Sequence, residues 1–246
     1  MPESYNNKIT VIIPTLNEAE NIGELLQFLK QNGQEHIAEI IVCDAESKDE
    51  TTAIAKDIGA QVICCEQTCR AHQMNEGAKI ATGDILYFVH ADAKPPKTFA
   101  TDIINFLQKG YDFGCYRFKF DSNHPFLAVN SFFTRFKVLW CRGGDQTLFI
   151  KKSVFDQNNG FNEEYVVMED FELIKKLWKK YKFGIIPKSV LVSARKYEDN
   201  SYWQVNMANL KIYRMFMKGF HPQVLKEKYF QLIKHLKKLN SQPLFK

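Results

Sequence analysis

The chain has 246 residues, of which 45% are hydrophobic and 25% charged, and its formal net charge is +5. These values are typical of a globular protein with a full hydrophobic core and exclude a disordered or fibrous chain. The longest stretch without a charged side chain, residues 122–134, is too short and too polar to span a bilayer. Because the N-terminus also lacks the pattern of a secretory signal, we expect a cytoplasmic protein whose six cysteines are reduced thiols.

The basic residues are concentrated towards the C-terminus. Residues 211–246 hold nine Lys or Arg and one acid, a net charge of +8, whereas residues 1–210 hold 24 Lys or Arg and 27 acids, a net charge of −3. Cations interleaved with apolar side chains over residues 202–246 predict reversible peripheral contact with an anionic membrane surface. A solvated helix face carrying lysines is the alternative.

The first half of the sequence alternates between two hydrophobic periods. Short apolar runs rich in β-branched residues predict buried strands over residues 9–13, 39–43, 61–65 and 85–89. Between them, helical spacing predicts one helix capped by Asn17, a second that opens with a capping box from Ser47 to Glu50 and ends at Gly59, and a third over residues 71–81. This alternation predicts an α/β fold, with a mostly parallel sheet and helices on both of its faces.

The second half is less regular. Residues 113–120 alternate like an exposed strand, and further strands are predicted over residues 147–151, 183–187 and 190–193. Helices are predicted over residues 169–181, 202–217 and 222–239. The aromatic side chains of residues 124–140 are expected to pack in the core, the alternatives being a cover over a binding site or contact with lipid. Without a repeat or a linker, we expect a single domain over residues 1–246.

Polar side chains follow the carboxyl ends of the predicted strands, where ligands bind in open α/β sheets. Asp44 and Asp92 each come directly after an apolar strand, and a carboxylate there needs solvent, a partner or a ligand because desolvating it alone is costly. Neither Gly-x-Gly-x-x-Gly nor a P-loop occurs at these strand ends. The residue types therefore favour a nucleotide diphosphate that is held by side chains and a divalent metal.

The ordered set of motifs resembles a known family. The chain is similar to the inverting family-2 glycosyltransferases, which have the GT-A fold, in the stretches IIPTLNE, IIVCDAESKDET, CRAHQMNEGAKIATGDILYFVHADA, GGDQTLFIKKSVFDQNNGFNE, VMEDFELIKKL and SARKYED. The likeness covers about Ile9 to Asp199 in the correct order. Its details resemble a bacterial subgroup of small soluble members whose acceptors are poorly defined.

The resemblance implies a nucleotide-sugar site on the strand ends. Asp44 matches the acid that reads the nucleotide base, with Ser47 close by, and Arg70 matches a basic residue near the donor diphosphate. The loop around base and ribose corresponds to Pro14, Thr15, Asn17 and Glu18. After Ala91, Asp92 matches the last acid of the Asp-x-Asp metal motif, whereas His90 stands where many relatives carry the first Asp. We therefore expect Mn²⁺ or Mg²⁺ on Asp92, with His90 as a further ligand that would favour Mn²⁺.

The resemblance also implies the catalytic residues. Asp170 matches the catalytic base and follows Glu169 at the start of a helix, where a carboxylate stays ionised and can take a proton from an acceptor hydroxyl. Arg195 matches a basic residue that neutralises the leaving diphosphate. The loop facing donor sugar and acceptor corresponds to Gly144, Asp145 and Gln146. The alternatives are an ordinary helix acid at position 170 and a surface ion pair at position 195.

Together these residues predict a metal-dependent, inverting transfer of a sugar from a nucleoside diphosphate donor, with UDP as the expected nucleotide, to a hydroxyl acceptor that could be lipid-linked. We expect a nucleotide-binding half (residues 1–112), an acceptor and catalytic half (113–200) and basic C-terminal helices (201–246), and no contact with nucleic acid. Two alternatives stand beside this prediction. A nucleotidyltransferase would need a Gly-rich triphosphate loop after the first strand, and a non-catalytic nucleotide-sugar-binding or membrane-adaptor protein would not hydrolyse a donor.

Overall fold

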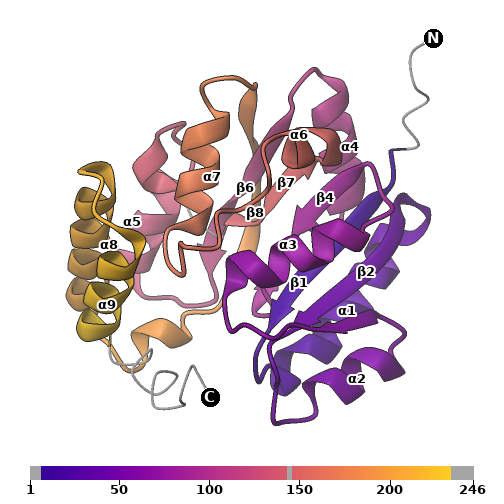
Figure 1. Ribbon diagram of the computed structural model, residues 1–246, viewed down its shortest axis with the longest axis horizontal. Coiled ribbons are helices and arrows are strands. Elements are labelled where there is room, and N and C mark those ends of the chain that lie inside the picture. The colour runs from indigo at the N-terminus through magenta and orange to yellow at the C-terminus, as the bar shows by residue number, and fades with distance from the viewer. Residues whose placement is uncertain (1–6, 143–145, 234–246) are drawn as a thin grey trace.

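A single curled sheet of eight strands forms the centre of the computed structural model, which describes residues 7–142 and 146–233 (Figure 1). The strand order is β3-β2-β1-β4-β7-β6-β8-β5. The strands are β1 (Ile9–Thr15), β2 (Ile37–Asp44), β3 (Gln61–Cys64), β4 (Ile85–Phe88), β5 (Ala93–Lys94), β6 (Phe113–Phe120), β7 (Leu148–Lys151) and β8 (Phe183–Val192). Within the described residues, β5 and β7 run opposite to the other six, so six strands end at the same edge of the sheet.

Helices cover both faces of the sheet, as predicted. The helices are α1 (Ala19–Gly33), α2 (Thr51–Asp57), α3 (Arg70–Ile80), α4 (Phe99–Gln108), α5 (Pro125–Phe133), α6 (Lys152–Gln157), α7 (Glu169–Leu177), α8 (Tyr202–Met217) and α9 (Pro222–Leu232). In β1, Val11 and Ile13 belong to the core formed with α1 and α4, whereas Ile12 belongs to the core formed with α3, α6 and α7. Alternate side chains of one strand thus build the two cores, because successive Cβ atoms point to opposite faces.

The approach of α3 to the sheet depends on a glycine. A Cβ atom built on Gly77 would lie 2.7 Å from both Cys43 Sγ and Ile12 Cγ2, closer than side-chain atoms approach one another. Gly77 therefore lets the helix lie directly on β1 and β2. This contact holds the first residue of α3, Arg70, near the carboxyl edge of the sheet.

Two predictions about strands are wrong. Residues 113–120 are not an exposed strand: β6 lies inside the sheet between β7 and β8, and its first four residues are buried because helices cover both of its faces there. The two predicted closing strands are one continuous strand, β8, which pairs in parallel with β6. A register shift between Tyr116 and Arg117 accommodates the extra residues at Pro187 and Lys188.

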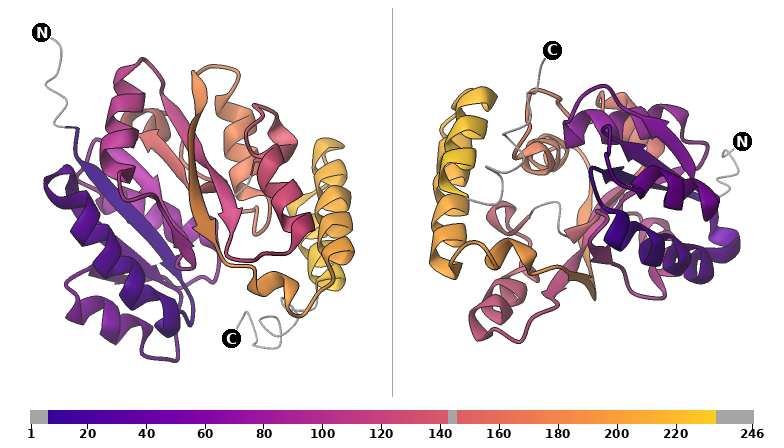
Figure 2. Two further views of the ribbon diagram at one scale, coloured as in Figure 1. Left: turned by 180° about the vertical axis from the view of Figure 1, so that it is seen from behind. Right: turned by 90° about the horizontal axis from the view of Figure 1, so that it is seen from below.

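The aromatic segment is also placed differently from the prediction. Core packing of residues 124–140 is wrong, because within α5 only Leu127 is buried. Exposed fractions between 38% and 53% are found for Phe126, Phe132, Phe133, Phe136 and Trp140. The physical reason is that α5 is short and contacts its neighbour α8 through few side chains: Asn130 Nδ2 donates to Asn206 Oδ1 at 3.0 Å, and the ring of Phe126 lies 5.2 Å from that of Tyr202. Figure 2 shows α5 standing beside α8.

The C-terminal helices form a separate layer at the far end of the sheet from α1 and α2 (Figures 1 and 2). The prediction of a helix over residues 202–217 is confirmed by α8, whereas the described part of the last predicted helix is α9 and residues 234–239 lie outside the described residues. Val205 and Ala208 of α8 pack near Ile233, and Ile212 and Phe216 pack on Leu225 of α9. None of the described helices combines the length and apolarity needed to cross a bilayer.

Candidate functional site

The polar residues predicted from the motifs gather at the carboxyl edge of the sheet. β1, β2 and β4 end there: Asp44 is the last residue of β2, and Glu18 and Asp92 lie in the segments that follow β1 and β4. β6 and β8 end at the same edge, and Arg195 follows β8 in the short 3-10 helix Arg195–Tyr197. β7 runs in the opposite direction and therefore begins at this edge, two residues after Gln146. The sheet thus brings together residues that are up to about 180 positions apart in the sequence.

Asp44 ties together the loops that follow β1 and β2. Its carboxylate is 1% exposed and accepts hydrogen bonds from the hydroxyl of Thr15 (2.8 Å), the backbone N–H of Ser47 (2.8 Å) and the hydroxyl of Ser47 (2.6 Å). A carboxylate offers about four acceptor positions, so three donors leave about one for a ligand. The burial of Asp44 is therefore compensated within the protein, and this residue shapes the loop that is predicted to face a nucleotide.

The predicted helix caps at Asn17 and Ser47 are wrong. α1 begins at Ala19, and Asn17 lies before it in the left-handed region with φ of 54°. Its backbone N–H donates to Ser47 Oγ at 2.8 Å, and its side-chain oxygen accepts from Lys48 N at 2.8 Å. α2 likewise begins after Ser47, at Thr51. Asn17 and Ser47 bond to each other's loop instead of to a helix end, which closes the two loops into one unit.

Arg195 joins three segments through its guanidinium group. It makes a two-pronged pair with Glu18, with Nη2 to Oε1 at 2.6 Å and Nη1 to Oε2 at 3.1 Å, and Nη2 lies 3.1 Å from Asp92 Oδ2. Burial lowers the pKa of the Arg195 guanidinium, but the hydrogen bonds that it donates to Glu18 and the negative charge of Asp92 outweigh this, so its pKa is raised. The pairing fixes a cation between the loop after β1 and the loop after β4.

The residues around Asp92 lie at the mouth of the site. Asp92 is about a quarter exposed, at 27% of its side chain, and Ala91 before it is buried in the core beside α1. His90 accepts from the backbone N–H of Ala93 through its carbonyl oxygen, at 3.0 Å. No group of three or more His, Cys, Asp or Glu that could hold a metal ion occurs in residues 7–142 and 146–233. A metal here would need ligands from a bound donor as well as from Asp92.

The two acids at the start of α7 are buried. Glu169 is 4% and Asp170 is 7% exposed, and both lie in the first turn of the helix, where the helix dipole favours a negative charge. Burial is the main cause that raises the pKa of the Cys115 thiol of β6; the cation of Arg142 opposes it, and the negative charge of Asp170 adds to it. Asp170 therefore lies close enough to Cys115, in the middle strands of the sheet, to act on it electrostatically.

The start of α7 also lies close to the start of α3. Burial raises the pKa of the Cys69 thiol, and the charges of Glu169 and Glu163 add to this effect. Cys69 is the residue before Arg70, and its thiol donates to the carbonyl oxygen of Glu163 at 3.6 Å. The predicted catalytic acids and the predicted diphosphate-binding Arg70 are thus on neighbouring helix ends.

Gln146 is a buried side chain at the entrance to β7. It is 1% exposed, its Oε1 accepts from Cys115 Sγ at 3.8 Å, and its Nε2 has no hydrogen-bond partner among the described residues. A buried amide donor without a partner costs free energy, and such groups are found where a ligand completes the bonding. Gly144 and Asp145, which were predicted to form the same loop, lie outside the described residues.

A cavity of about 680 Å³ adjoins the site at Arg195. It lies between the ends of β6 and β8 and the start of α8, and aromatic rings form much of its wall: Phe126, Tyr197, Tyr202 and Trp203. Asp121 lies at its rim and accepts from the backbone N–H of Ala194 at 2.7 Å. Aromatic faces with a few polar groups are suited to binding an organic molecule.

Comparison with known proteins identifies the family. The sequence pattern of the family described as "Glycosyl transferase family 2" matches residues 10–177, more than half of the chain. The chain belongs to glycosyl transferase family 2. It spans about a third of the length of the curated relatives that it matches. One of them is a dolichol-phosphate mannosyltransferase from Pyrococcus furiosus, which is 29% identical over 110 residues, covering 43% of this chain and 31% of the relative.

Solved structures confirm the predicted GT-A fold of this family 2 chain. A mannosyltransferase from Pyrobaculum calidifontis, in complex with GDP-Man and Mn²⁺, has a TM-score of 0.66 at 20% identity and covers 98% of this chain and 72% of its own. Glucosyl-3-phosphoglycerate synthase from Mycobacterium tuberculosis, in complex with Mn²⁺ and UDP, has a TM-score of 0.61 at 15% identity, over 83% and 79% of the two chains. At these identities the likeness concerns the fold alone.

Several residues of the site were not predicted from the sequence. Gln73 of α3 is 3% exposed and donates to the carbonyl oxygens of Thr15 and Cys43, at 2.9 and 2.7 Å, which locks α3 to the ends of β1 and β2. Thr147 and Met168, next to Gln146 and Glu169, have φ angles of 53° and 72°. Such a conformation is unfavourable for these residue types and is often kept at functional sites. One feature of the sequence could have pointed to these residues: Gln73 is polar on a face of α3 whose other residues are small or apolar.

Proposed function

We propose that this family 2 chain transfers a sugar from a nucleoside diphosphate donor, UDP-linked, to a hydroxyl group with inversion at the anomeric carbon. The observation that carries the proposal is the meeting of three groups at one edge of the sheet. They are the loop unit built on Asp44, the cation of Arg195 beside Asp92, and the buried acids that open α7. In this proposal Asp170 accepts the proton of the acceptor hydroxyl, and the cation of Arg195 stabilises the leaving diphosphate.

Asp170 is the proposed base. Inversion requires the acceptor hydroxyl to attack the anomeric carbon from the side opposite the leaving diphosphate, and its proton must go to a neighbouring base. Asp170 lies in the first turn of α7, where the helix dipole favours a negative charge, and a carboxylate is a group that can accept a proton. Arg195 and Arg70 balance the negative charge that grows on the leaving diphosphate.

The ligand atoms around Asp92 suit a divalent cation whose coordination is completed by the phosphates of the nucleotide-sugar donor. Mg²⁺ and ions like it are bound in such sites by one or two carboxylates together with substrate phosphates, so a closed cage of protein ligands is not required. Asp92 would hold the ion, with His90 two residues before it, and the bound ion would act as a Lewis acid on the diphosphate. The Mn²⁺ in the two solved relatives supports this proposal.

The acceptor is proposed to be lipid-linked and to enter through the aromatic cavity beside Arg195. Support comes from the position of that cavity between α5 and α8 and from a relative that is named for dolichol phosphate. The cavity wall is formed mainly by ring faces, which suit the apolar faces of a sugar or the first carbons of a lipid chain.

A panel of nucleotide sugars, measured by thermal shift with and without Mn²⁺, tests the donor. A ligand present at 100 times its Kd stabilises the folded state by about 2.7 kcal/mol, which is a shift of roughly 5–11 °C for a chain of this length. We expect UDP-sugars to give such a shift only with the metal, and release of UDP from the donor to follow. Binding without any release of UDP would favour the non-catalytic alternative, and no shift with any donor would contradict the proposal.

A further inference from the structure

The helix α8 is apolar on two opposite faces. Its inner face is buried against α9 and the segment before α7, through Val205, Ala208, Ile212 and Phe216. An outer stripe of exposed side chains runs along the other face: Trp203, Met207, Leu210, Arg214 and Met217. Their spacing of three and four residues aligns them along the helix. Because Trp203 is 65% and Met207 is 61% exposed, this face is an apolar surface without a partner in the described part of the chain.

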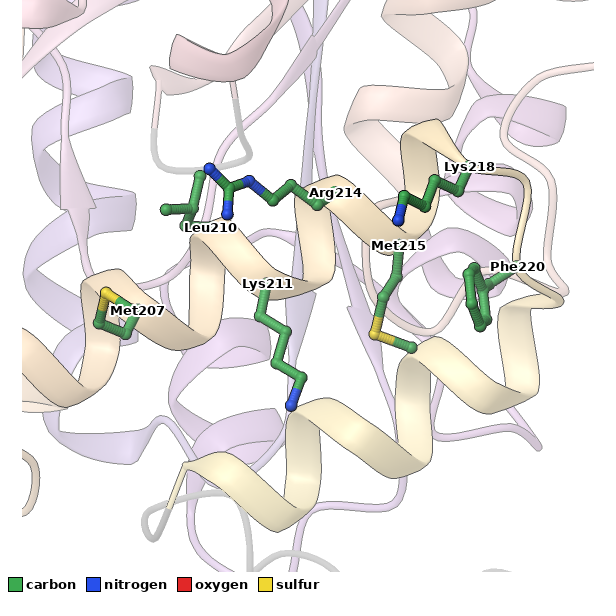
Figure 3. A pocket seen from close by; sticks show the side chains of 7 residues that line it. All are labelled: Met207, Leu210, Lys211, Arg214, Met215, Lys218 and Phe220. Atoms are coloured by element: carbon green, nitrogen blue, oxygen red, sulfur yellow. The ribbon is translucent and has the colours of Figure 1, made fainter.

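Cations lie within and beside the outer stripe. Lys211, Arg214 and Lys218 stand around a groove of about 340 Å³ whose other lining side chains are apolar: Met207, Leu210, Met215 and Phe220 (Figure 3). None of the three cations forms a salt bridge with a described residue, and the sequence has no Asp or Glu over residues 200–226. The surface therefore combines an apolar floor with positive charge that no carboxylate among the described residues pairs with.

We propose that the outer stripe of α8, with Lys211 and Lys218, docks on an anionic lipid bilayer. An amphipathic helix that lies in a membrane interface buries its apolar side chains at the boundary of the acyl chains and holds its cations at the level of the lipid phosphates. Lys and Arg suit this position because their long apolar stems follow the apolar surface while the charge reaches the phosphates. The groove around Met215 offers room for part of a lipid.

Other occupants of this face fit the charges less well. A symmetric contact with a second copy would bring Lys211, Arg214 and Lys218 of one copy against the same patch of the other, with no carboxylate to pair with them. The segment of this chain that follows Ile233 contains four lysines and no acid, so it has the same sign of charge as the groove. A nucleic acid would pair with the cations, but its phosphates would gain nothing from exposed Met207 and Leu210.

The docking surface is continuous with the aromatic cavity. Trp203 begins the outer stripe and also lines the cavity beside Arg195, where its ring lies 5.9 Å from that of Phe126 in α5. A bilayer against α8 would therefore lie next to the mouth of that cavity. A lipid-linked acceptor could then pass from the bilayer into the cavity. This step rests on the proposed function, whereas the docking itself does not depend on it.

Flotation with lipid vesicles tests the docking. The full chain is mixed with vesicles of phosphatidylcholine, with or without phosphatidylglycerol, at low and at high salt. The triple variant Lys211→Gln, Arg214→Gln, Lys218→Gln removes the cations, and a matched control, Lys56→Gln, Lys109→Gln, Lys179→Gln, removes the same charge from exposed lysines on other elements. The variant Met207→Ser, Leu210→Ser removes apolar contact. All of these side chains are exposed, so the variants keep the fold.

The expected result is binding to the anionic vesicles only, weakened by salt. Each cation is worth about fivefold in affinity, so the stripe triple variant should bind about 10²-fold more weakly and the control within about twofold of the unmodified chain. The Ser variant should lose the binding that remains at high salt. The proposal would be overturned if the control variant lost binding equally or if the chain bound neutral vesicles equally well. Displacement of the chain from the vesicles by a single-stranded oligonucleotide or by inorganic phosphate, at matched ionic strength, would overturn it too.

A separate measurement distinguishes this proposal from the proposed function. Calorimetry with UDP and Mn²⁺ in the absence of vesicles should give the same affinity for the unmodified chain and for the stripe triple variant. Loss of vesicle binding with intact UDP binding would then be a property of α8 alone. Absence of UDP binding together with intact vesicle binding would contradict the proposed function and leave the docking surface in place.

Discussion

Replacing Asp44 separates its structural role from its proposed role in reading a nucleotide. Asp44→Ala removes the acceptor for two hydroxyls and for the backbone N–H of Ser47. The hydroxyls can turn to other partners, but the partly buried N–H group of Ser47 loses its acceptor. Loss of three hydrogen bonds to a charged group that is itself buried should lower the free energy of unfolding by about 3 kcal/mol.

Asp44→Asn should behave differently. The amide oxygen can accept from the backbone N–H of Ser47, and the amide NH₂ can donate to the hydroxyls of Thr15 and Ser47. All three hydrogen bonds are then kept, but without the negative charge, so we expect a loss of about 1 kcal/mol in the free energy of unfolding. For a chain of this length the melting temperature should fall by about 2–4 °C for Asp44→Asn and by about 6–12 °C for Asp44→Ala.

The assay is thermal unfolding combined with calorimetry of UDP binding. If Asp44 contacts the base as an acceptor, Asp44→Asn should weaken UDP binding by about tenfold or more although the fold is nearly unchanged, because the free acceptor position is altered. Thr15→Val serves as a control, since it removes one hydrogen bond to Asp44 and keeps the carboxylate. Unchanged UDP affinity in Asp44→Asn would refute a direct role in binding and leave Asp44 as a residue that only shapes the loop.

Three further predictions concern the base, the metal and the packing of α3. Asp170→Asn keeps the shape of the side chain but cannot accept the proton, so transfer should fall by about 10²–10⁴ while donor affinity is unchanged; a normal turnover rate would exclude Asp170 as the base. Asp92→Ala should abolish the dependence of UDP binding on Mn²⁺, as measured by titration with and without EDTA, and persistence of that dependence would place the metal elsewhere. Gly77→Ala should lower the free energy of unfolding by about 1–3 kcal/mol, because the new methyl group would lie 2.7 Å from Ile12 and Cys43; an unchanged denaturation midpoint would contradict this packing.

Local patterns in the sequence were sufficient for the elements that are defined by hydrophobic period. β6 and α8 have the predicted limits, and the end of α2 follows from Gly59, which has φ of 79°. These features depend on neighbouring residues only, since a helix end or a strand run is encoded within a few positions. The ordering of the motifs along the chain was likewise enough to predict the family and its fold.

The partners of the site residues could not be read from the sequence. A capping box and a ligand-binding loop use the same Ser, Asn and Asp side chains, and only the pairing of β1 with β2 decides that Asn17 bonds to the loop of Ser47. The pairing of Arg195 with Glu18 joins residues that are 177 positions apart. Neither contact produces a periodic pattern in the sequence, because both depend on the order of the strands in the sheet.

The pattern of hydrophobic residues in the sequence was enough to determine that this chain folds as an α/β domain. It also showed that acids and amides stand at the ends of the strands. Which apolar side chains stay exposed was decided by the tertiary structure. The Phe and Trp side chains of residues 124–140 and the outer stripe of α8 have the composition of core segments, but the sheet has no further face for them to cover. A hydrophobic pattern records that a surface can be buried, and only the packing of the other elements decides whether the chain itself buries it.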